Sequence, residues 1–398
     1  MLLLLLLHAT TARSAAATSR LRGGAMQPQW EVVSAAAEPV IGKDLANPHG
    51  ILQGFETGNF MKVNNTYYYA ATELGFCKGI RWDSTTRAGL WSAPNSTGPW
   101  TRLVTLRNTS SMYTVCKDPA GQYNDNTVAW ATTLVFALSG VNGSKEVWNL
   151  FHHAGEAERF QPGDGIVHLV STTDSIEGPY VELMGTAVPG KAVVVPDSHA
   201  FAAWKLRNGS WAGFRNNVPG AKSFSVGMIY ASEEGGRSVG GTWTYPNNNS
   251  VPFRFGPENP QVASSTDEHW YYSVYDALLQ EPQGQTDSAT VIDKNEKIES
   301  SAGLCTDKTK CDSIGIAWSA DGFSWFANAS TTLRVQGLNG SDNHPCGQIR
   351  TALGLVAEPK LCAGCYSVLW TGFSDKPSPD HQGFEPVCQA IIRNVNEK

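Results

Sequence analysis

The sequence predicts an all-β protein, specifically a five-bladed β-propeller. Three observations lead to this prediction. An aromatic strand pattern occurs five times, a second pattern centred on a serine follows four of these copies, and convincing long amphipathic helix patterns are absent. Only the polar segment 279–310 is ambiguous in this respect. The chain has 398 residues, of which 41% are hydrophobic, so it contains enough apolar material for a large packed core.

The aromatic pattern alternates with period two and is bounded by Gly, Pro, Asn or Asp, as expected of half-buried strands. Its copies are "NTYYYAAT" from residue 65, "KEVWNLFHHAG" from 145, "NGSWAGFRNN" from 208, "EHWYYSVYDA" from 268 and "CYSVLWTGF" from 365. The last copy is followed by a closing strand, "VCQAIIRNV", from residue 387.

The second pattern reads apolar-x-apolar-x-Ser and leads into a turn that ends in Gly-Pro or Trp. Its serines are Ser92, Ser171, Ser232 and Ser319, spaced by roughly 60 to 90 residues. Similar four-stranded units of this length, joined by turns, are typical of a propeller. The alternative is a β-sandwich whose strands resemble one another by coincidence, but sandwiches rarely repeat one motif so evenly.

The N-terminus has the features of a targeting segment. A leucine run at 2–7 precedes small residues around Ala15–Ala17, where a signal peptidase could cut, although a basic n-region is missing. We expect residues 1–24 to be a signal peptide or a disordered N-terminus, and 25–398 to form a single propeller domain. The alternative, an organelle-targeting segment, draws some support from Arg13, Arg20 and Arg22.

Glycosylation sequons also favour a secreted, extracellular glycoprotein. Eight occur, at Asn64, Asn95, Asn108, Asn142, Asn208, Asn248, Asn328 and Asn339. Chance would supply several of them in a chain so rich in Asn and Ser.

The cysteine count is even, which in an exported protein points to disulfide bonds. The eight are Cys77, Cys116, Cys305, Cys311, Cys346, Cys362, Cys365 and Cys388. Cys305 and Cys311 could close one small loop. For the two cysteines of "CAGC" at 362–365, the alternative to a structural disulfide is a redox motif or half of a zinc site, although no second CxxC accompanies them.

Charge and hydropathy exclude several partners. The net charge of −6 argues against nucleic acid, which needs a clustered basic face. No stretch after the N-terminus reaches the 18 or more consecutive apolar residues of a membrane-spanning helix. We therefore expect a protein that binds neither nucleic acid nor membranes. We also expect it to be a monomer whose partner is a carbohydrate.

Acidic residues occur where the inner strands of a propeller should begin. An inner strand precedes the aromatic strand by about ten to fifteen residues, and this spacing selects Glu56, Asp197 and Glu258. Gly256, Pro257 and Pro260 flank Glu258 and would fix the direction of its carboxyl group. The equivalent segment of the second blade contains Trp130 and no acid. That of the fifth blade contains His344, Gln348 and Arg350.

Convergent carboxylates suit the hydrolysis of glycosidic bonds. One carboxylic acid protonates the leaving oxygen and a second activates water or attacks the sugar, while a third raises the pKa of the acid by charge repulsion. The 13 Trp and 12 Tyr could stack against sugar rings. Because no basic cluster accompanies the acids, neutral sugars are favoured, and no cofactor is required by this chemistry.

At these residues the chain resembles the five-bladed propeller glycosidases of glycoside hydrolase family 43. "DSHAF" at 197–201 is similar to the family's Asp-x-x-x-Phe strand, and "ENP" at 258–260 is similar to its Glu-Gly-Pro, with Asn for Gly. The resemblance extends from about residue 50 to the end. It implies that Glu258 is the general acid, that Asp197 tunes and orients it, and that the mechanism is inverting.

Blade one departs from the family pattern, because Glu56 stands near the position of an aspartate base and one residue out of register. Glu56 is therefore either the base or a structural residue. The resemblance also implies a possible structural calcium ion in the channel, near His344. Trp130, His153, Gln348 and Arg350 are the expected substrate-binding residues.

Each of these residues also has a structural interpretation. Glu258 could form an ion pair with Arg254 or Arg350, and Asp197 could be a turn residue after Pro196. His152 and His153 could be core histidines, and Trp130 could pack between blades. The sequence thus predicts a secreted hydrolase of arabinan, xylan or galactan type. The alternative is an inactive propeller that binds carbohydrate or a protein partner through the same central pocket.

Overall fold

The structure is a computed structural model, and it describes most of the strands and their shorter connections. The described residues are 28–75, 86–107, 130–139, 145–154, 165–182, 193–196, 198, 200–216, 226–231, 236–240, 243–244, 258–265, 267–278, 312–327, 332–333, 345–346, 349–372 and 384–397.

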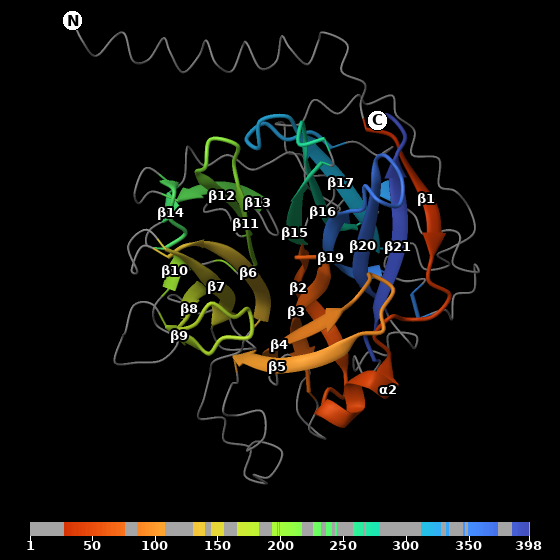
Figure 1. The fold of residues 1–398 in the computed structure, drawn as a ribbon, viewed down its shortest axis with the longest axis horizontal. Coiled ribbons are helices and arrows are strands. Elements are labelled where there is room, and N and C mark those ends of the chain that lie inside the picture. Colours follow the sequence, from red (N-terminus) through yellow and green to blue (C-terminus); the bar gives the residue numbers. More distant parts are fainter. Residues whose placement is uncertain are drawn as a thin grey trace, which may run out of the picture.

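These residues form five antiparallel sheets arranged as a propeller (Figure 1). Each sheet begins with an inner strand: β2 (Gly54–Val63), β6 (Trp130–Leu138), β11 (Phe201–Lys205), β15 (Glu258–Ser264) and β19 (Ile349–Ala357). Each inner strand contacts the next, and β19 contacts β2, so the ring is closed. The predicted all-β class and propeller arrangement are confirmed.

The repeated sequence patterns form the second and third strands of the sheets. The aromatic copies are β3 (Thr66–Leu74), β7 (Glu146–Ala154), β12 (Trp211–Asn216), β16 (Tyr271–Leu278) and β20 (Cys365–Gly372). The strands after them are β4 (Thr86–Ala93), β8 (Gly165–Ser171), β13 (Val226–Ala231), β17 (Asp312–Ser319) and β21 (Val387–Asn394). The aromatic pattern therefore forms the second strand of every sheet, and the serine pattern corresponds to the third strand of four sheets, with the predicted closing strand at that place in the fifth.

The outer strands are shorter and more exposed. They are β5 (Thr101–Arg107), β9 (Tyr180–Glu182), β10 (Val193–Pro196), β14 (Trp243–Thr244), β18 (Thr332–Leu333) and β1 (Trp30–Ala35). Helical structure in the described residues is limited to α2 (Lys43–Ala46) and a 3₁₀ turn, η1 (Asn47–His49). No helix among them is long and apolar enough to cross a membrane.

The core lies between neighbouring sheets, so the middle strands are covered on both faces. Tyr272 and Trp318 of one sheet pack against Tyr366 and Trp370 of the next in a single cluster. All the residues of β20 are buried. Burial of such aromatic side chains is the main source of stability in this arrangement.

Strand β1, from the N-terminal part of the chain, completes the sheet formed by β19, β20 and β21. It pairs with β21, from Trp30 opposite Asn394 to Ala35 opposite Ala390. The Trp30 ring makes edge contacts with Tyr272 and Tyr366, at centroid distances of 5.0 and 5.5 Å. The sequence analysis predicted the C-terminal closing strand but missed its N-terminal partner.

Two disulfide bonds join cysteines in the described residues. Cys346 is bonded to Cys388, and Cys362 to Cys365. The "CAGC" sulfurs are therefore bonded to each other rather than arranged as a zinc half-site. The other four cysteines, including Cys305 and Cys311, lie outside the described residues.

Three of the sequon asparagines are described, and all three are exposed in turns between strands: Asn64, Asn95 and Asn208. The N-terminal segment 1–24 lies outside the described residues.

Candidate active site

The inner strands begin at one end of the central channel and end at the other. Along β2 and β6, Thr57 Oγ1 accepts a hydrogen bond from Ala131 N, and Asn59 bonds to Leu134 further on, so the two strands run in the same direction. Along β2 and β19, Glu56 meets Arg350, while Phe60 lies against Gly354. Of the residues predicted for the site, Glu56 and Arg350 therefore lie together near one end of the channel.

Glu56 is the third residue of β2 and is only 1% exposed. Arg350, the second residue of β19, donates from Nη2 to Glu56 Oε1, and its side chain is 24% exposed. The Thr371 hydroxyl donates to the Glu56 carbonyl at 3.4 Å. The ion pair thus joins the first sheet to the last and leaves the arginine partly accessible.

A second acid, Glu385, approaches this pair, and the sequence analysis did not identify it. Its backbone is held by two hydrogen bonds, from Phe55 N to Glu385 O at 2.9 Å and from Glu385 N to Gln53 O at 2.8 Å. Gly54 permits this approach, because a Cβ there would lie 2.1 Å from Glu385 O. The sequence indicates Glu385 only weakly, because it is a single Glu in "FEP" before a strand and the other blades carry no repeat of this motif.

Burial raises the pKa of Glu385 to about 7, while the charge of Arg350 acts in the opposite direction. Its Oε2 atom is buried and has no hydrogen-bond partner among the described residues, although the residue as a whole is partly exposed. A carboxyl group with such a pKa carries a proton over much of the neutral range. It could therefore donate a proton in chemistry that needs an acid.

His153 stands opposite Trp130 in the register of β7 and β6. It is buried, and burial lowers its pKa to about 4, so its imidazole is neutral at neutral pH. His152 is also buried, with a pKa lowered to about 3, and its Nδ1 lies 2.9 Å from the carbonyl of His153. The burial of both side chains agrees with the interpretation of His152 and His153 as core histidines. Sugar binding by His153 stays a prediction.

Some predicted site residues are described only by their place in a strand, and others lie outside the described residues. Glu258 is the first residue of β15, opposite Asp276 of β16, and Trp130 is the first residue of β6. Nothing is described of their side chains. Asp197, His344 and Gln348 lie outside the described residues, so their positions stay predictions.

The described residues contain no group of three or more His, Cys, Asp or Glu side chains that could hold a metal ion. The calcium ion that the resemblance implies therefore has no ligand set in this part of the chain. We derive no chemical step through a metal.

Comparison with known proteins bears on the fold. No family model matches the sequence, and no curated protein matches it. Among solved structures, an α-L-arabinofuranosidase from Podospora anserina in complex with cellotriose matches with a TM-score of 0.52 and 11% identity, over 93% of this chain and 98% of that one. The catalytic domain of a family 62 α-L-arabinofuranosidase from Coprinopsis cinerea matches with a TM-score of 0.51 and 12% identity, over the same shares.

The chain has the propeller fold of these two α-L-arabinofuranosidases. The first match, a family 43 β-1,3-galactosidase, has a TM-score of 0.47 and 10% identity. It covers 94% of this chain but only 64% of the longer protein. At such identities the likeness concerns the glycosidase fold, and the chemistry has to be argued from this chain's own residues.

Proposed function

We propose that the protein is a secreted glycoside hydrolase that cleaves neutral polysaccharides or oligosaccharides of arabinan, xylan or galactan type. In this proposal the propeller has five blades, residues 25–398 form one domain, and the protein acts as a monomer. The supporting relatives are two α-L-arabinofuranosidases, one of them in complex with cellotriose.

One observation carries the proposal: the inner strands form a closed ring in a glycosidase fold, and two of the predicted acids belong to the first residues of such strands. Glu56 and the backbone of Glu258 stand near the N-terminal ends of β2 and β15. Five inner strands with one direction bring residues that are distant in sequence to one mouth of the channel. This is the arrangement that two-carboxylate hydrolysis requires.

The proposed roles follow the inverting mechanism. Glu258 donates a proton to the leaving glycosidic oxygen, and Asp197 raises the pKa of Glu258 by charge repulsion and orients its carboxyl group. A base then removes a proton from the attacking water on the opposite side of the sugar ring. Trp130, His153, Gln348 and Arg350 would contact the sugar.

Glu56 has two possible roles. As the base it must reach a water molecule, yet its carboxylate is buried and bound to Arg350. As a positioning residue it would instead hold Arg350 toward the sugar hydroxyls. The second role accounts for both the burial of Glu56 and the partial exposure of Arg350, so we favour it.

The same ion pair supports a second candidate function, a propeller that binds carbohydrate without cleaving it. A carboxylate held in a buried ion pair is less available for acid–base chemistry than a free one. The channel and its aromatic residues would remain suitable for binding.

The test compares sugar release by the wild type and by Glu258→Gln on arabinan, xylan and galactan oligosaccharides. We expect release by the wild type and a loss of at least a hundredfold in the variant, because general acid catalysis contributes about 10²–10⁴-fold. Proton NMR of the fresh product should show inversion at the anomeric carbon. Equal release by both proteins would remove Glu258 from the acid role, and binding without release by the wild type would favour the second function.

A further inference from the structure

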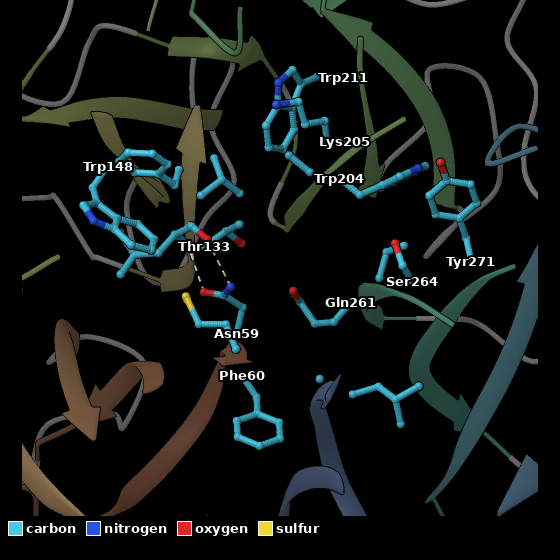
Figure 2. A pocket seen from close by; sticks show the side chains of 18 residues that line it. Asn59, Phe60, Thr133, Trp148, Trp204, Lys205, Trp211, Gln261, Ser264 and Tyr271 are labelled. Atoms are coloured by element: carbon cyan, nitrogen blue, oxygen red, sulfur yellow. Dashed lines mark hydrogen bonds between the residues drawn. The ribbon is translucent and has the colours of Figure 1, made fainter. Parts of the chain in front are cut away.

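A cavity of about 320 Å³, shown in Figure 2, lies between the inner strands, and its lining includes neither Glu56 nor Arg350. Its walls come from the later residues of all five inner strands: Asn59–Met61, Thr133–Phe136, Ala203–Lys205, Gln261–Val262 with Ser264, and Gly354–Leu355. The lining includes Lys205 and Ser264, the last residues of β11 and β15, whereas Glu56 and Arg350 are the third and second residues of β2 and β19. The cavity is therefore distinct from the candidate active site.

Hydrogen bonds between blades hold the walls of this cavity in place. Asn59 Nδ2 donates to Leu134 O at 3.2 Å, and Leu134 N donates to Asn59 Oδ1 at 2.9 Å. The Thr133 hydroxyl donates to Phe201 O at 2.7 Å. These bonds join β2, β6 and β11, so the cavity is largely preformed and would lose little entropy on binding a ligand.

Gln261 supplies polar groups that the protein itself does not use. Figure 2 shows its side chain projecting into the cavity, toward Asn59. The register of β15 shifts between Glu258 and Gln261, next to Pro260, and such irregularities redirect side chains. Within the described part of the chain the Gln261 amide has no hydrogen-bond partner, so its two donors and its acceptor remain available.

Aromatic rings supply the apolar part of the lining. Phe136 is 45% exposed, and its ring lies 5.3 Å from that of Trp148. Trp204, Trp211 and Tyr271 border the cavity from neighbouring strands. Flat apolar faces beside a few polar groups match the two kinds of surface on a sugar ring.

Among the described residues of the lining, one side chain is charged: Lys205, whose Nζ is paired with Glu146 Oε1 at 3.0 Å. An anionic ligand would have to compete with this carboxylate, and a cationic ligand would find no carboxylate in the lining. We infer that the cavity is a binding site for a neutral mono- or disaccharide. Since the part of the lining that the structure describes contains no carboxylate, we expect the site to bind sugar without cleaving it.

The ligand class follows from the lining alone and does not depend on the proposed hydrolysis. Isothermal titration of the full chain with arabinose, xylose, galactose and their disaccharides tests the inference. At least one sugar should bind to the wild type and to Glu258→Gln alike. Gln261→Leu, which replaces the amide with an apolar side chain of similar size, should weaken that binding at least tenfold.

Two further variants complete the test. Phe136→Ala should also weaken binding, and its partial exposure makes the substitution compatible with folding. Gln29→Leu makes the same chemical change as Gln261→Leu at an exposed position beside β1 and should bind as the wild type does. Thermal unfolding checks that all variants are folded.

The inference is overturned if no sugar of the panel binds, or if folded Gln261→Leu and Phe136→Ala bind as tightly as Gln29→Leu. Its failure is distinguishable from that of the proposed function. Gln261→Leu should still release sugar from polysaccharide, whereas Glu258→Gln should not. A protein that hydrolyses nothing but loses sugar binding in Gln261→Leu would contradict the hydrolase and support this site.

Discussion

Arg350 is the residue that links the acids at the mouth of the channel. It binds Glu56 directly, and its charge acts on the carboxyl group of Glu385. Two acids and one arginine make a site where only one negative charge is compensated by an ion pair. Burial raises the pKa of Glu385 to about 7 despite the charge of Arg350, so this carboxyl group is partly protonated near neutral pH.

This difference predicts how stability depends on pH. The pKa of Glu385 is about 7 in the folded protein, against a reference value of 4.5. The folded state therefore binds more protons than the unfolded state between these values, and the free energy of unfolding falls as pH rises through them. Glu385→Gln removes this titration. The free energy of unfolding of the variant, relative to that of the wild type, should therefore be about 1 to 3 kcal/mol higher at pH 8 than at pH 5, after allowance for solvent screening.

Urea unfolding of the wild type and of Glu385→Gln at the two pH values would measure this gain. The same difference between the two proteins at both pH values would contradict the raised pKa. A shift in the alkaline limb of the activity profile in this variant would further assign Glu385 to the reaction.

The sequence predicted this site only in part, and the reason is the way in which the residues reach it. Glu56 and Arg350 were identifiable, because both lie on inner strands at a fixed spacing before an aromatic strand. Glu385 arrives from the connection between β20 and β21, where no repeat indicates its position. Its approach depends on Gly54 lacking a side chain, which is a property of the packed structure.

At the scale of elements, a buried charge network holds the first sheet together. Glu73 of β3 is fully buried and accepts hydrogen bonds from Arg87 Nε at 2.5 Å, Arg102 Nε at 2.8 Å and Trp91 Nε1 at 2.9 Å. These partners lie on β4 and β5, so one carboxylate connects three strands. Gly89 faces it, and a Cβ at that position would lie 2.0 Å from Glu73 Oε1.

Glu73→Gln should destabilise the protein by about 3 to 5 kcal/mol, because it leaves two arginines without their buried counter-charge. Glu146→Gln is the matched control, since the Glu146–Lys205 pair is exposed and should contribute less than about 1 kcal/mol. Chemical denaturation of both variants measures the two effects. Similar losses in both would show that the network contributes no more than a surface ion pair.

The aromatic strands were predictable because each carries its own alternating pattern and turn residues. Strand β1 was not, because "WEVVSA" is short and mostly exposed, and its partner is more than 350 residues away. The outer strands β14 and β18, of two residues each, carry too little pattern to be recognised.

At the scale of the whole molecule, the ring depends on a joint between the two ends of the chain. Trp30 contacts Tyr272 in one sheet and Tyr366 in the next, and Gln29 O accepts a hydrogen bond from Val395 N at 2.9 Å. The last sheet is thus completed by an N-terminal strand.

Trp30→Ala should lower the free energy of unfolding by about 2 to 3 kcal/mol, somewhat less than a fully buried tryptophan would, because the ring is only partly buried. Val33→Ala changes the same strand at a side chain that is 50% exposed and should have an effect below about 0.5 kcal/mol. Urea unfolding followed by circular dichroism compares the two. Equal effects would mean that the tryptophan does not anchor the joint.

The pairing of β1 with β21 also constrains the order of assembly during synthesis. Strand β1 leaves the ribosome early but must wait for β21, since residue 30 pairs with residue 394. Until then the sheet of β19 and β20 lacks its two outer strands, and β1 is an unpaired segment that could bind other chains. The contacts with the largest sequence separation are therefore the last to form, and a nascent chain that stalls before β21 cannot complete this sheet.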